Sequence, residues 1–127
     1  MIIGIGVDIV DIERIKQKIE AQSGFKEYVF SSDEMNACDH KSNRYESYAA
    51  RFAAKEAFLK ALGTGIDLSF ELHELEVKNN EAGKPYFSYS STVEDILLTT
   101  VGSIPDIQLS LSHSKEQAIA FVVFNKI

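Results

Sequence analysis

The stretch RFAAKEAFLKALGTG, residues 51–65, decides how this chain folds. On a helical wheel, at about 100° per residue, it places large apolar side chains on one arc and small side chains on the opposite arc. The large residues are Phe52, Phe58, Leu59 and Leu62, and the small ones, counted from one residue earlier, are Ala50, Ala53, Ala54, Ala57 and Ala61. A helix that is apolar or small nearly all round is usually buried. We therefore predict a buried helix from about Tyr45 to Leu62, ended by the Gly-Thr-Gly sequence.

Two charged residues, Glu56 and Lys60, lie one turn apart in the narrow seam between the two arcs. An unpaired charge inside a protein is expensive, so both side chains should have partners.

The first residues of the chain, 2–10, are rich in β-branched side chains and predict a strand. One face carries Ile3, Ile5, Val7 and Ile9, and the other carries Gly4, Gly6 and Asp8. Because the glycines leave the second face without side chains, another backbone or a ligand can approach it closely. Asp8 ends that bare face with a carboxylate.

The remaining pattern mixes hairpins with separate helices, which is typical of the α+β class. We expect a helix over 11–22, with Ile12, Ile15 and Ile19 buried and Gly24 as its stop, and a short helix from the capping box at 31–34 to residue 39. Strands over 70–77 and 86–89 should flank a turn at 79–83. A helix over 92–101 should follow, and then strands over 107–112 and 118–124 joined as a hairpin.

Composition is that of an ordinary globular protein. The 127 residues suffice for one domain, and 45% apolar with 25% charged residues is usual for that class. The net charge of −6 argues against a general nucleic-acid binder. The single cysteine, Cys38, cannot form an internal disulfide, and we expect a free thiol in a reducing compartment. Without a basic leader or an apolar run of membrane-spanning length, we expect a cytoplasmic protein with no membrane contact.

The carboxylates of Asp8 and Glu56 allow two interpretations. If they meet, a cation must lie between them, and magnesium suits that site because it binds one or two carboxylates together with substrate phosphates. Lys60 would then neutralise a phosphate on the same side. In the alternative, Glu56 pairs with Lys60 along the helix and Asp8 caps the following helix. The spacing alone favours this alternative.

Three further features each have a structural and a functional interpretation. His113, where a strand meets a turn, is either a structural hydrogen-bonding group or a donor to a phosphate. Lys84 and Pro85 either leave a hairpin turn or contact a phosphate or adenine. Gly63 and Gly65 either end the helix or let a nucleotide approach the backbone.

Four segments of the chain together resemble the holo-[acyl-carrier-protein] synthase family, the small, single-domain branch of the 4′-phosphopantetheinyl transferase superfamily. They are GIGVDIVDIERI at 4–15, RFAAKEAFLKALGTG at 51–65, GKP at 83–85 and LSLSHSKEQAIAFVV at 109–123. The resemblance implies one domain over 1–127, with a mainly antiparallel sheet packed against a long buried central helix. One departure is Ser114, because the family pattern commonly has threonine after the histidine; the hydroxyl is kept.

The resemblance also implies a reaction and its residues. The family transfers the 4′-phosphopantetheine arm of coenzyme A to a serine of apo-acyl carrier protein and releases adenosine 3′,5′-bisphosphate. By motif, Asp8 and Glu56 match the magnesium ligands, and Lys60 matches the lysine near the coenzyme A phosphates. His113 matches the histidine beside the nucleotide. Further candidates for coenzyme A contact are Gly63, Gly65, Lys84, Pro85 and Ser114. Either Glu56 or a water held by the metal would take the serine proton.

The family is typically a homotrimer with active sites between subunits, so Asp8 and His113 need not come from the same chain as Glu56. Its acyl carrier partners are acidic, and a net charge of −6 would repel them at long range. Arg14 and Lys18, one turn apart on the first helix, offer a local docking surface; the alternative for Lys18 is a solvated helix face.

Two rival functions remain open at this point. One is a magnesium-dependent nucleotide-binding regulatory module that transfers nothing. The other is a broader transferase acting on peptide or polyketide carriers, which the short chain disfavours because that branch resembles a two-fold duplication of this unit.

Overall fold

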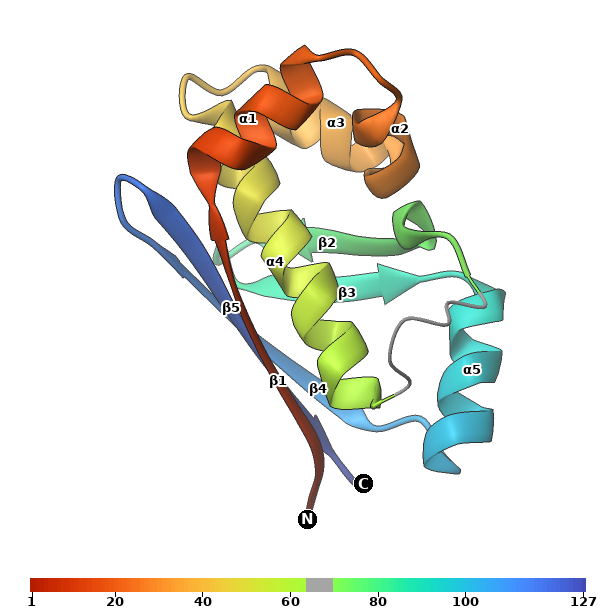
Figure 1. Cartoon of the computed structure of the whole chain (residues 1–127). Helices are drawn as coiled ribbons and strands as arrows, with labels where there is room; N and C mark the ends of the chain where they lie inside the picture. Colours follow the sequence, from red (N-terminus) through yellow and green to blue (C-terminus); the bar gives the residue numbers. More distant parts are fainter. Residues whose placement is uncertain (64–69) are drawn as a thin grey trace.

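The computed structural model of the chain describes residues 1–63 and 70–127. Its elements are, in order, β1 (Ile2–Asp11), α1 (Ile12–Glu20), α2 (Phe25–Val29), α3 (Ser32–Asp39), α4 (Arg44–Leu62), the 3₁₀ turn η1 (Leu72–Glu74), β2 (Leu75–Asn79), β3 (Pro85–Tyr89), α5 (Ser91–Val101), β4 (Asp106–His113) and β5 (Gln117–Asn125). Figure 1 shows α4 at the centre, with the short helices α1, α2 and α3 gathered at its N-terminal end. The predicted α+β class, with an antiparallel sheet against a long buried helix, is confirmed.

The main sheet has the strand order β1-β5-β4, with both pairs antiparallel. Its inner face packs on α4 with almost no side chain between the backbones. A Cβ atom on Gly4 would collide with the carbonyl oxygen of Ala61, and one on Gly6 would collide with that of Ala57. The sequence predicted that either a backbone or a ligand approaches this glycine face, and in the structure it is the backbone of α4. Only glycine fits at these two positions.

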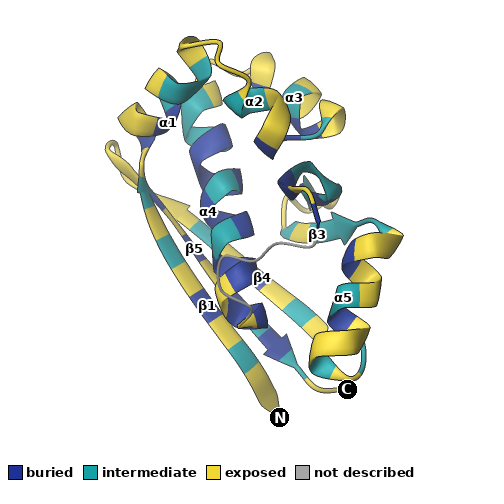
Figure 2. Ribbon diagram, turned by 45° about the vertical axis from the view of Figure 1, so that its right-hand side comes forward, coloured by how far each residue is buried: buried dark blue, intermediate teal, exposed yellow. Residues whose placement is uncertain are grey.

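Helix α4 is the buried core of the molecule (Figure 2). It begins one residue before the predicted start and ends at Gly63, whose φ of 79° is the left-handed conformation that favours glycine. Phe58 of α4 makes edge contacts with Phe124 of the main sheet and with Phe87 of β3, so one side chain joins both sheets. The hairpin of β2 and β3 lies on the side of α4 away from β1.

The capping box predicted at the start of α3 is present, with Ser31 and Glu34 bonding each other's backbone. Cys38 of the same helix is a free, buried thiol, and burial raises its pKa.

Three details of the predicted secondary structure are wrong. α1 ends at Glu20, and Gly24, with a φ of 95°, begins the unpredicted short helix α2 instead of stopping α1. Residues 70–74 are not strand: Glu71 and Glu74 form a capping box around η1, so the turn buries Leu72 and Leu75 three residues apart. Alternating apolar residues cannot distinguish such a turn from the start of a strand.

The outer face of the main sheet is apolar and has no cover among the described residues. Val7 pairs with Phe121 and Ile9 pairs with Ile119 across β1 and β5, and all four side chains are exposed. Contiguous apolar surface of this kind usually marks an interface. None of the helices in the described parts of the chain combines the length and apolarity needed to cross a bilayer.

Candidate active site

A cavity of about 380 Å³ lies between the end of β1, helix α1 and the middle of α4. Asp8 and Glu56 both line it, so the two carboxylates meet within a single chain. Asp8 follows Gly4 and Gly6 on the inner face of β1, and this alternation directs its side chain toward α4. The cavity is also lined by Arg14 and Lys18, which the sequence assigned separately to partner docking.

Lys60 reaches across from α4 to the strand. Its Nζ donates to Asp8 Oδ1 at 3.1 Å and to the Val7 carbonyl oxygen at 2.9 Å. Glu56 forms no ion pair or hydrogen bond with any described residue, so the expected Glu56–Lys60 pair along the helix is absent from that part of the chain. The N-cap of α1 is Asp11, not Asp8. The structural alternative for these residues therefore fails, and the convergent one is retained.

The electrostatics of the cavity weigh against the ionised form of Glu56. Burial raises the pKa of the Glu56 carboxyl, and the neighbouring charge of Asp8 raises it further. Lys60 and Lys18 oppose both effects without cancelling them. A carboxyl in a cavity whose pKa is shifted by burial and by a neighbouring charge is a candidate functional group.

The donor set of this cavity fits magnesium better than the other common protein metals. Three acidic residues, Asp8, Asp11 and Glu56, line the cavity, and Asp11 accepts a hydrogen bond from Gln117 Nε2 at 3.2 Å. The described residues contain no cluster of three or more histidine, cysteine, aspartate or glutamate side chains able to hold a metal, so no more than two of these carboxylates converge. Zinc usually takes three or four protein ligands, whereas magnesium is typically coordinated by one or two carboxylates, with water and phosphate oxygens as its other ligands.

A second cavity, of about 390 Å³, lies on the other flank of α4, against β4 and the turn that leads into β3. Three of its lining residues are cationic or can become so: Lys41, Arg51 and His113. The cavity also contains Gly83 and Pro85, two residues of the GKP segment. Because β5 separates β1 from β4, the two cavities border opposite edges of the main sheet.

Arg51 is the unusual member of this second cavity. Its side chain is buried, with 5% of the residue exposed, yet no carboxylate among the described residues pairs with it. Nη1 donates to Ser47 Oγ at 2.5 Å and Nη2 to Asn79 Oδ1 at 3.4 Å, while the buried Nε finds no acceptor in the described part of the chain. An anionic ligand would compensate the charge of this buried guanidinium, which has no counter-ion among the described residues.

Of the other predicted contact residues, some line the second cavity and others have side chains that bond elsewhere. His113 lies at the mouth of the second cavity, with Nδ1 3.7 Å from Glu46 Oε2. Lys84 instead donates to Gln108 at 3.2 Å, and the Ser114 hydroxyl accepts two backbone N–H groups of its own hairpin turn. Gly63 ends α4 as described, and Gly65 lies outside the described residues.

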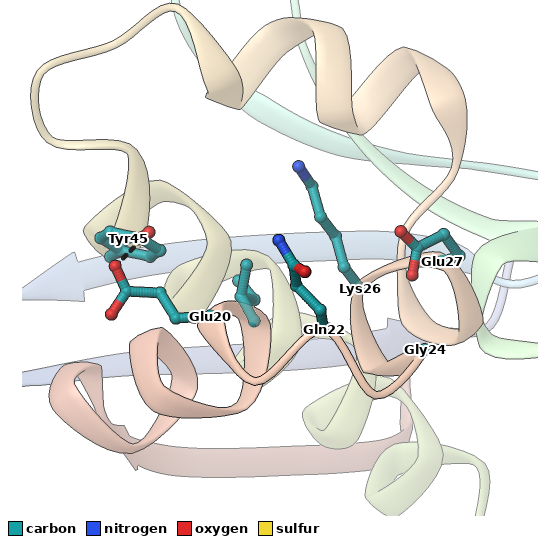
Figure 3. A pocket seen from close by; sticks show the side chains of 7 residues that line it. Glu20, Gln22, Gly24, Lys26, Glu27 and Tyr45 are labelled. Carbon is teal, nitrogen blue, oxygen red and sulfur yellow. Dashed lines mark hydrogen bonds between the residues drawn. The ribbon is translucent and has the colours of Figure 1, made fainter.

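A third cavity, of about 590 Å³, is larger than both but contains none of the predicted residues. Figure 3 shows Gln22 in the α1–α2 turn and Lys26 and Glu27 on α2, with Glu20 and Tyr45 joined by a hydrogen bond on the other side of the cavity. Its lining carries charges of both signs, and Lys26 is already paired with Asp39. Size alone therefore does not identify the active site.

Comparison with known proteins agrees with the resemblance. The family model for the 4′-phosphopantetheinyl transferase superfamily matches residues 4–122. The chain belongs to this superfamily. It is 66% identical, over 99% of both chains, to the holo-[acyl-carrier-protein] synthase of Cytophaga hutchinsonii. It is 36% identical, with a TM-score of 0.81 over 100% of this chain and 99% of the other, to the holo-(acyl-carrier-protein) synthase of Bacillus anthracis solved in complex with CoA (3′,5′-ADP). The Neisseria meningitidis synthase gives a TM-score of 0.88 at 34% identity, over 99% of this chain and 100% of that one.

The family and the enzyme class expected from the sequence, a phosphopantetheinyl transferase, are therefore confirmed. Sequence reasoning missed two buried cations of the transferase helix α4, Arg51 and Lys55. A signal for both was present, because on the same helical wheel they fall inside the arc of large apolar residues. No comparable signal marked Lys41, which lies in a polar connector.

Proposed function

We propose that this transferase moves the 4′-phosphopantetheine group of coenzyme A to a serine hydroxyl of apo-acyl carrier protein, with magnesium, in the cytoplasm. The products are holo-acyl carrier protein and adenosine 3′,5′-bisphosphate. The observation that carries the proposal is the convergence of Asp8 and Glu56 on one cavity whose rim holds Arg14 and Lys18. A site that must bring an anionic diphosphate to an acidic carrier needs both kinds of residue in one place.

In this proposal Asp8 and Glu56 hold the metal, and Lys60 contacts a phosphate of coenzyme A. When bound, magnesium offsets the charge of the diphosphate and of the leaving group. Lys60 is well placed for its role because it already neutralises Asp8 at 3.1 Å and its side chain remains 55% exposed. The remaining work of these side chains is to hold the diphosphate in line with the incoming serine oxygen.

We assign the second cavity to the nucleotide end of coenzyme A. Arg51, Lys41 and His113 supply positive charge for its phosphates, and Gly83 and Pro85 supply a flat backbone wall. Lys84 and Ser114 are kept as contact candidates by resemblance only, because their side chains bond elsewhere in the chain.

The active enzyme in this proposal is a homotrimer whose sites form between subunits. Two observations support it: the uncovered apolar face of the main sheet, and the position of the two cavities at opposite edges of that sheet. Packing of copies on the apolar face would bring the metal cavity of one chain toward the nucleotide cavity of the next.

Mass spectrometry of an apo-carrier incubated with enzyme, coenzyme A and magnesium tests the activity. We expect a gain of one phosphopantetheine, lost in Glu56→Gln and retained in Glu13→Gln, an exposed control on α1 that removes the same charge. No transfer to several carriers, together with nucleotide binding, would favour the regulatory module. Transfer to peptide or polyketide carriers as fast as to fatty-acid carriers would favour the broader enzyme.

Complementation tests the shared sites. At a coenzyme A concentration far below the raised KM of Arg51→Gln, Glu56→Gln should be inactive and Arg51→Gln nearly so. Mixed trimers should then regain activity if one chain supplies the metal cavity and its neighbour the nucleotide cavity. Recovery in no mixture would place both cavities of a site in one chain.

The oligomeric state is tested by light scattering, which should report a trimer for the native chain and a smaller species for Val7→Lys. Thr100→Lys, exposed on α5, is the matched control.

A further inference from the structure

The charge of Lys55 is buried at the centre of the molecule. Its residue exposure is 0%, and its Nζ donates to Glu34 Oε1 at 2.6 Å, to the Val29 carbonyl at 2.6 Å and to the Leu72 carbonyl at 3.1 Å. An ammonium group has three protons, so every donor is used.

Its partner Glu34 also has both carboxylate oxygens hydrogen-bonded. Glu34 Oε1 also accepts the backbone N–H of Ser31 at 3.1 Å, and Oε2 accepts that of Val77 at 2.9 Å. The side chain of Lys55 thus joins α4 to the end of α2, the start of α3 and the turn η1, and Glu34 adds the strand β2. We call this set of contacts the Lys55 junction.

Stability alone does not account for such a junction. Buried ion pairs repay their desolvation poorly, and replacing both partners by apolar groups is often neutral or stabilising. The geometry offers something that an apolar contact lacks: three directed bonds from three separate segments, which fix the ammonium group in space.

On its opposite flank α4 is held by the close contact of Gly4 and Gly6 with its backbone at Ala61 and Ala57. Glu56 follows Lys55 by about 100° around the helix and lies between these two attachments. A turn of α4 about its own axis would swing Glu56 relative to Asp8. The glycine contact sets how closely α4 approaches the sheet, whereas the Lys55 junction resists rotation.

We propose that Lys55 is a positioning residue for the transfer reaction, which fixes the rotation of α4 so that Glu56 faces Asp8. This inference rests on the proposed role of Glu56. It assigns to the buried pair an effect on metal binding and turnover that its contribution to stability does not explain.

The test compares Lys55→Met, Glu34→Leu and the double variant with the native enzyme. Lys26→Met, which breaks the partly exposed pair with Asp39, is the control. Each variant is measured by thermal unfolding, by titration of manganese(II) followed by electron paramagnetic resonance, and by kcat. We expect the single variants to lose stability and the double variant to regain part of it, because no lone buried charge remains but the backbone groups of Val29, Leu72 and Val77 still lack a partner. In the double variant kcat should stay lower by on the order of 10²-fold, since a displacement of about 1 Å is that costly. Manganese binding should stay weakened.

Recovery of kcat and manganese affinity along with stability in the double variant would show a purely structural junction and overturn the inference. If neither variant that carries Lys55→Met folds, Glu34→Gln decides, because it keeps the side-chain volume and one acceptor oxygen. A lower kcat at retained stability supports positioning, and an unchanged kcat refutes it. Glu56→Gln distinguishes failure of the proposed active site from failure of the positioning role. If Glu56→Gln is active, the proposed site is wrong. If it is inactive while the double variant is fully active, only the positioning role of Lys55 is wrong.

Discussion

Lys55 and Glu56 are neighbours on one helix, yet the burial and the hydrogen bonding of their charged groups differ. Lys55 is fully buried and every proton of its ammonium group has an acceptor. Glu56 is less buried but has no hydrogen-bond partner among the described residues, and its pKa is raised by burial and by Asp8. Burial alone therefore does not describe the difference between these two neighbours; Lys55 has its hydrogen bonds satisfied and Glu56, the proposed metal ligand, does not.

The same distinction applies one turn earlier on α4. Arg51 is nearly as buried as Lys55, but it has no carboxylate partner and an unbonded Nε in the described part of the chain. Along one face of one helix, a satisfied cation sits one turn from an unsatisfied one. The satisfied charge holds elements together, and the unsatisfied one borders a cavity.

Breaking the satisfied pair should give the largest effect. Lys55→Met leaves the Glu34 carboxylate and two carbonyl oxygens buried without a donor. We expect a loss of about 3–5 kcal/mol in the free energy of unfolding, measured by urea denaturation. Lys26→Met, at the partly exposed pair with Asp39, should lose about 1 kcal/mol or less. Equal losses in the two variants would contradict the contrast drawn for α4.

Removing the unsatisfied cation should act on binding instead. Arg51→Gln should raise the KM for coenzyme A roughly tenfold to a hundredfold, the range expected for hydrogen bonds to a charged group, with little loss of stability. Arg44→Gln is the matched control, since that guanidinium lies 4.8 Å from the centre of the Tyr45 ring and does not line the cavity. Steady-state kinetics with coenzyme A varied measure both, and a native KM in Arg51→Gln would remove this residue from the nucleotide site.

A smaller effect is expected at the rim of the metal cavity. Arg14→Ala should raise the KM for the acyl carrier several-fold, more than the KM for coenzyme A, and the difference should shrink at high salt because exposed charges are screened. Lys16→Ala on the same helix is the comparison, because Lys16 lies over the Tyr45 ring at 5.6 Å. Equal rises for both substrates would exclude Arg14 as a docking contact.

The smallest effect concerns Glu56 in metal-free protein. Its folded-state pKa lies above the ordinary value of 4.5, so the carboxyl binds its proton more tightly in the folded state than in the unfolded one. Stability is therefore lost as the pH rises through the folded-state pKa. Glu56→Gln should raise Tm by a few degrees at pH 7, and the gain should vanish below pH 4.5, where both states are protonated. Calorimetry in chelator measures this, and a destabilised Glu56→Gln at pH 7 would speak against the raised pKa.

Much of this architecture was readable from local patterns. The glycine face of β1 predicted a close approach by another backbone or a ligand, and the alanine arc predicted that α4 is buried. The structure places the backbone of α4 against Gly4 and Gly6. The capping box at Ser31 predicted the start of α3. These features are carried by the identity of adjacent residues, so short-range rules suffice.

The rest depended on contacts between distant segments. The Lys55 junction joins residues up to 43 positions apart, and no spacing rule links Lys55 to the Val29 carbonyl or to Glu34. Lys60 lies one turn from Glu56 on the helix, yet in the fold it bonds Asp8, 52 positions away. The family resemblance supplied the two candidate metal ligands, whereas Arg51 stood out only once the structure showed that its buried Nε has no acceptor among the described residues.

Calorimetric titration of magnesium tests the central claim most directly. With coenzyme A present, the native protein should bind one magnesium ion per site, and Asp8→Asn and Glu56→Gln should each weaken that binding at least about tenfold, by loss of one of the two carboxylates. Native-like magnesium affinity in both variants would contradict the account.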